Sequence, residues 1–131
     1  MNSEDAERIR EAALAVAAVI TPLTDEVKRS EVDWSRPYMV GFITTLIGLH
    51  FMLNLSRLAD SEMTTALGIA WTEVTGTPWT DEFQSLVTSR EGDFEEGANN
   101  ASRFVRSVHF EGNVQGGAAL WREVFVSRAA G

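Results

Sequence analysis

Apolar residues recur at helical spacing along most of the chain. Near its start, Ile9, Ala13, Val16 and Ile20 follow spacings of four, three and four, with charged residues between them. This spacing places the apolar side chains on one face of an α-helix. Pro22 follows directly, and we expect it to stop or kink the helix, because proline has no N–H and restricts the residue before it.

The most apolar stretch, residues 37–55, holds nineteen residues without a formal charge. Ser35 can cap a helix here, with Arg36 and Pro37 in its first turn, where a missing N–H costs nothing. We expect a helix over about 36–58 that is apolar on all sides and lies buried in a helical bundle. A membrane-spanning helix is the alternative. Polar residues inside the stretch and arginines at both flanks favour the bundle.

Further helices follow from the same periodicity. A third helix should end at Gly76, because the residue that ends a helix often adopts the left-handed backbone conformation. Thr77 or Thr80 can cap a short fourth helix, and Asp93 with Glu96 forms a capping-box-like start for a fifth. The expected ranges are Asp60 or Ser61 to Gly76, about Thr80 to Arg90, Asp93 to about Phe110, and a last helix after Gly117 that carries Ala118 and Trp121.

No stretch shows the sustained alternation of a strand, and no long linker or repeat divides the chain. We therefore expect an all-α fold. Residues 1–131 form one domain of five to six helices around the long apolar helix of residues 36–58.

Composition narrows the functional classes. The chain has 19 Asp and Glu against 11 Lys and Arg, a net charge of −8. This balance argues against a protein that binds nucleic-acid phosphates, which requires clustered basic residues. The absence of cysteine excludes disulfides, thiolate metal sites and cysteine nucleophiles. The first ten residues lack the basic start of a secretory signal, so we expect a cytoplasmic protein.

The acidic excess lies in residues 60–96, which hold nine acidic residues and one basic residue. Trp79 stands in a turn of this segment, and large aromatic side chains concentrate binding energy at interfaces. We therefore expect a non-enzymatic interaction protein, such as a regulator, inhibitor or immunity-type protein, that docks on a basic protein surface. The expected contact residues are Trp79, Asp81, Glu82, Glu95 and Glu96.

Two alternatives stand beside this interpretation. The acidic residues can serve solubility alone. Trp79, like Trp34 in an earlier turn, can instead be a lid folded over the core.

The second functional hypothesis is a ligand-binding or enzymatic pocket. His50, Asn54, Arg57 and Ser61 follow spacings of four, three and four, so a continuous helix holds them on one face. The imidazole can exchange a proton near neutral pH, and the guanidinium can hold an anion. The pocket would be built on His50, Asn54 and Arg57. Buried structural hydrogen bonds of His50 and Asn54 would explain the same pattern.

Arg103, Arg106 and His109 form another stripe, which can receive a phosphate or acidic partner or else balance the acidic segment. We expect no metal and no cofactor, because neither histidine has the spacing of a zinc or di-iron helix motif. A homodimer stays open, since a helix apolar nearly all round needs cover on every side.

Overall fold

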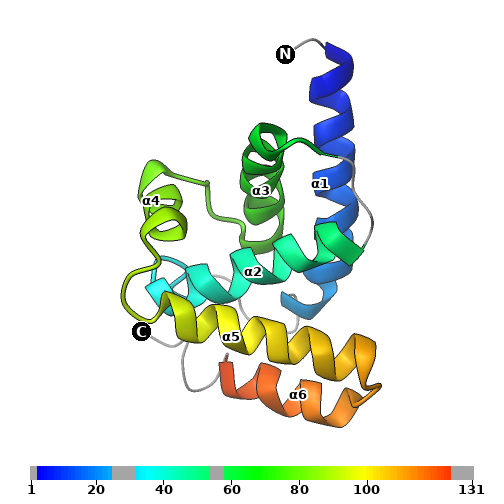
Figure 1. Cartoon of the computed structure of the whole chain (residues 1–131), viewed down its shortest axis with the longest axis vertical. Coiled ribbons are helices and arrows are strands. Elements are labelled where there is room, and N and C mark those ends of the chain that lie inside the picture. Colours follow the sequence, from blue (N-terminus) through cyan, green and yellow to red (C-terminus); the bar gives the residue numbers. More distant parts are fainter. Residues whose placement is uncertain (1–2, 25–31, 54–57, 125–131) are drawn as a thin grey trace.

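The structure, a computed structural model, describes residues 3–24, 32–53 and 58–124. These parts form six α-helices and one π-helical turn, and they contain no β-strand (Figure 1). The expected all-α fold is confirmed. The elements are α1 Ser3–Thr24, α2 Pro37–Leu53, α3 Asp60–Thr75, α4 Asp81–Ser89, α5 Phe94–Val105, η2 Arg106–Phe110 and α6 Val114–Glu123. Within the described ranges, no helix has both the length and the hydropathy that crossing a membrane requires.

Local signals explain several helix ends. Gly76 ends α3 in the left-handed conformation, with φ 74°, and its N–H donates to the carbonyl of Thr72 at 2.9 Å. Thr80 caps α4, because its Oγ1 accepts the N–H of Phe83 at 3.4 Å. Asp93 precedes α5, but its side chain makes no capping hydrogen bond. The expected capping box is wrong there. The Asp93 backbone does not adopt the extended conformation that directs a capping side chain towards the N–H groups of the first helical turn.

Some expected boundaries differ from the structure. The last helix begins at Val114 and not after Gly117, so Gly116 and Gly117 lie inside it. The first helix does not stop at Pro22 but continues to Thr24. Pro22 lies in the last turn, where its missing N–H removes a single hydrogen bond. Thr24 holds this end in place by donating through Oγ1 to the carbonyl of Val74 at 3.1 Å. The second helix is described as far as Leu53, residues 54–57 lie outside the described residues, and Leu58 lies outside any helix.

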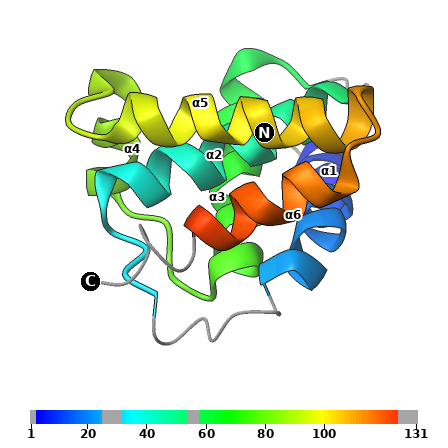
Figure 2. The same ribbon diagram turned by 90° about the horizontal axis from the view of Figure 1, so that it is seen from below.

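Helices α2 and α5 make the most extensive contact in the fold, and they run side by side in the same direction (Figures 1 and 2). A Cβ atom on Gly41 would lie 2.1 Å from the carbonyl oxygen of Phe94. One on Gly97 would lie 2.0 Å from the carbonyl oxygen of Tyr38. Both distances are far inside van der Waals contact, so only glycine permits this approach. Asn100 Nδ2 also donates to the Tyr38 hydroxyl at 2.6 Å across the same contact.

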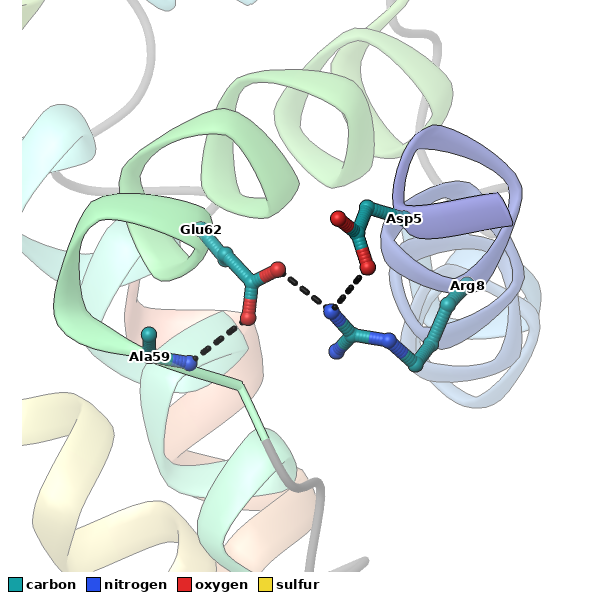
Figure 3. Close-up of polar contacts among 4 residues, drawn as sticks. All are labelled: Asp5, Arg8, Ala59 and Glu62. Carbon is teal, nitrogen blue, oxygen red and sulfur yellow. Dashed lines mark hydrogen bonds and ion pairs between the residues drawn. The ribbon is translucent and has the colours of Figure 1, made fainter. Parts of the chain in front are cut away.

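Helices α1 and α3 form the second large contact (Figure 1). Arg8 of α1 donates to Glu62 of α3 and, at 3.2 Å, to Asp5 (Figure 3). The other oxygen of Glu62 accepts the N–H of Ala59 at 2.9 Å. The pKa of Glu62 is lowered, first by the Arg8 hydrogen bond and then by that of Ala59. The arginine is exposed, so the pair orients the two helices more than it stabilises them.

Trp71 of α3, fully buried, is the centre of an aromatic cluster. Its ring centroid lies 6.5 Å from that of Trp34, 5.4 Å from Trp79 and 5.0 Å from Phe83. Trp34 is only 4% exposed and Trp79 is half-buried. The turns that carry these two tryptophans therefore fold over the core, as the lid alternative expects.

The glycines of the α2–α5 contact give a direct test. We expect Gly41→Ala and Gly97→Ala each to lower the free energy of unfolding by about 2 kcal/mol or more, because each methyl group would force the helices apart. Gly48→Ala is the matched control on α2, since its Cβ would meet nothing within 4 Å. That variant should gain up to about 1 kcal/mol from helix propensity. Urea denaturation measures all three, and equal effects would contradict the glycine argument.

Candidate functional site

A pocket of about 500 Å³ lies where the C-terminal ends of α1 and α2 meet the corner between α5 and α6 (lower right of Figure 1). We call it the His50 pocket. Its size falls in the range of about 300–1,000 Å³ that is typical of small-molecule sites. Its lining residues are Val19, Pro22, His50, Phe104, Val108, His109, Val114, Ala118, Trp121 and Arg122.

The π-helical turn shapes one wall of this pocket. A π turn holds an extra residue, and Val108 and His109, which are adjacent in sequence, both line the pocket. Short π-helical segments inside helices occur frequently at functional sites. Gly117 then lets α6 lie close to this turn, because a Cβ there would be 2.4 Å from Cγ2 of Val108.

His50 is the buried polar group of the pocket, with only 3% of the residue exposed. Its Nδ1 lies 2.8 Å from the carbonyl oxygen of Leu46. A carbonyl oxygen only accepts hydrogen bonds, so Nδ1 carries the hydrogen and, in the neutral ring, Nε2 is an acceptor. The pKa of His50 is lowered from 6.5, mainly by burial and further by His109, although the bond to Leu46 opposes the shift. The imidazole is therefore neutral at pH 7.

His109 and Arg122 complete the polar side of the pocket. The rings of His50 and His109 meet edge to face, with centroids 5.4 Å apart. Arg122 contributes a guanidinium from the last turn of α6, and no described carboxylate forms an ion pair with it. Because no acidic side chain of the described residues lines the pocket, its polar side offers a positive charge and two imidazoles. The described residues contain no group of three or more side chains suited to a metal ion.

The structure places the residues of the predicted His50 site in two groups. His50 lies in the pocket, whereas Asn54 and Arg57 lie outside the described residues. The predicted stripe of Arg103, Arg106 and His109 does not form one site. His109 lines the pocket, whereas Arg103 donates to Asn100 at 3.2 Å. Sequence reasoning did not link His109 or Arg122 to His50. No spacing rule connects positions this far apart, and the only signal was that the chain has just two histidines.

The predicted acidic contact residues lie mainly at helix starts. Asp81 and Glu82 occupy the first turn of α4, and Glu95 and Glu96 that of α5. Carboxylates are stabilised there by the partial positive charge of the helix N-terminus. Glu95 also bonds to Arg90, and this hydrogen bond is the main cause of its lowered pKa.

Trp79 and Asp81 line a second hollow, between α3 and α4. We call it the Trp79 groove. It does not include Glu82, Glu95 or Glu96, so the five predicted contact residues do not share one hollow.

Comparisons of the chain with family models, curated proteins and solved structures find no match. The fold and the pocket themselves define the class of molecule: an all-α domain with a largely apolar pocket. That pocket is bounded on one side by two histidines and an arginine.

The neutral state of His50 makes stability depend on pH. Between the lowered folded-state pKa of His50 and about pH 6.5, the unfolded chain binds more protons at His50 than the folded protein does. The free energy of unfolding should therefore fall as the pH drops from about 7.5 through the folded-state pKa. His50→Asn keeps an N–H for the Leu46 carbonyl but does not titrate, so its profile should be flatter. Urea denaturation across this range checks it, and parallel profiles would show that His50 is not held neutral.

Proposed function

We propose that this protein binds a small, largely apolar molecule carrying a carboxylate or similar anionic group in the His50 pocket. The supporting observation is the lining of the pocket. An apolar wall from four helical segments faces a polar side formed by His50, His109 and Arg122. Ligand sites in proteins combine a mainly apolar surface with a few convergent polar groups in the same way.

Each part of the lining favours a particular part of the ligand. Removing apolar ligand surface from water at Phe104, Val108 and Trp121 would provide about 25 cal/mol per Å². The guanidinium of Arg122 offers paired donors that match a carboxylate. The neutral His50 would accept a hydrogen bond through Nε2 from a hydroxyl or amide of the ligand.

The polar side discriminates between ligand charges. A cationic ligand would meet Arg122, and no acidic residue in the described lining would balance its charge. The pocket therefore favours acids over amines of the same shape.

Thermal shift assays with matched probes test this proposal. Medium-chain and aryl-substituted carboxylic acids should raise the melting temperature in a concentration-dependent way, because ligand binding to the folded state stabilises it. The corresponding alcohols should give smaller shifts and the amines none. Arg122→Gln should remove the preference for acids over alcohols, whereas Arg103→Gln, an exposed arginine outside the pocket, should leave it intact.

A blocking variant provides the second arm of the test. Ala118 lines the pocket but is itself exposed, so Ala118→Phe should fill the space without disturbing the core. This variant should keep the wild-type melting temperature and lose the response to every acid. Acids that stabilise wild type, Ala118→Phe and Arg122→Gln equally would bind elsewhere, and an absence of any shift would refute the proposal.

A further inference from the structure

The Trp79 groove, of about 690 Å³, is the other large hollow of the described residues. It lies between α3 and the start of α4, whereas the His50 pocket lies at the far end of α2 (Figure 1). Among the described residues, the lining contains an indole, three threonines, a glutamine and two carboxylates, but no basic residue. The charge of this lining is therefore opposite in sign to that of the His50 pocket.

The aromatic wall of the groove is held rigidly. Trp79 packs over Gly68, where a Cβ atom would lie only 3.2 Å from Cδ1 of the indole. Its centroid lies 5.4 Å from that of Trp71 and 5.6 Å from that of Phe83. Because buried rings support it from below, the indole is positioned before any partner arrives. Little entropy remains to be lost there on binding.

The polar lining of the groove includes several hydrogen-bond acceptors. Asp81 supplies a carboxylate beside Trp79. Gln84 also lines the groove, and its Oε1 is buried without a hydrogen-bond partner among the described residues. A buried acceptor of this kind gains from any donor that a bound group brings.

We infer that the Trp79 groove receives an arginine side chain from a basic segment of a protein partner. A guanidinium is planar, carries five N–H donors and one positive charge, and stacks on indole rings. It therefore matches the chemistry of the indole and of the Asp81 carboxylate, which both line the groove. The net charge of −8 over residues 60–96 would attract such a segment from a distance. This inference is independent of the ligand proposed for the His50 pocket.

Fluorescence anisotropy with labelled peptides of alternating arginine and glycine tests the inference. The arginine peptide should bind more tightly than a lysine–glycine peptide, and a citrulline–glycine peptide should not bind. Asp81→Asn should weaken arginine-peptide binding about three- to fivefold, the upper range for one exposed ion pair. Glu82→Gln is the matched control, since it removes the same charge from the same helix turn but lies outside the groove. It should change the affinity less than twofold.

Two further variants separate this site from general charge attraction. Thr65→Arg places a permanent guanidinium in the groove lining and should abolish peptide binding while circular dichroism stays unchanged. Ala118→Phe, which blocks the His50 pocket, should leave peptide binding intact, so the two proposals can fail separately. Equal weakening by Asp81→Asn and Glu82→Gln, equal binding of the lysine peptide, or no binding of the arginine peptide would each overturn the inference.

Discussion

Backbone contact between α2 and α5 fixes the separation of the helix that carries His50 and the helix that leads to His109. At Gly41 and Gly97 the two helices meet with no side chain between them, so their separation is fixed by backbone atoms rather than by adaptable rotamers. From this crossing both helices run in the same direction, α2 toward His50 and α5 toward His109, which follows it. Two histidines that are 59 residues apart in sequence thereby come to lie 5.4 Å apart between ring centroids.

The same contact explains why the pocket forms at this end of the molecule. Near the crossing, α2 and α5 leave no space between them. Farther along the two helices, the end of α1 and α6 border the space that forms the pocket. Helix ends leave apolar side chains partly in solvent, and Val114 is 66% exposed at the pocket lining. Phe110, next to His109, is 70% exposed. Covering an exposed apolar side chain such as Val114 lowers the free energy, so it would contribute to binding of the proposed ligand.

Helical periodicity was sufficient to predict the all-α class and most helix starts, because apolar spacing and caps act locally. It was insufficient for the site. His50 was identified from its place in an apolar helix, but its proposed neighbours Asn54 and Arg57 were chosen on the assumption that the helix continues to Leu58. Asn54 and Arg57 lie outside the described residues. The polar residues that line the pocket together with His50, namely His109 and Arg122, come from other helical segments. Their proximity depends on two glycines whose role is tertiary, and an isolated glycine in a helical pattern gives no direction to its partner.

The acidic segment illustrates how structure changes the meaning of composition. Six of its nine carboxylates stand in the first turns of α3, α4 and α5, where they stabilise the helix starts. Much of the charge that sequence reasoning assigned to a partner surface therefore already serves the fold. Asp81 and Glu82 are alike in charge and in helix turn, yet only Asp81 borders Trp79 in a hollow. In the binding inferred for the Trp79 groove, the shape beside each carboxylate would therefore decide recognition, and net charge alone would set only the long-range attraction.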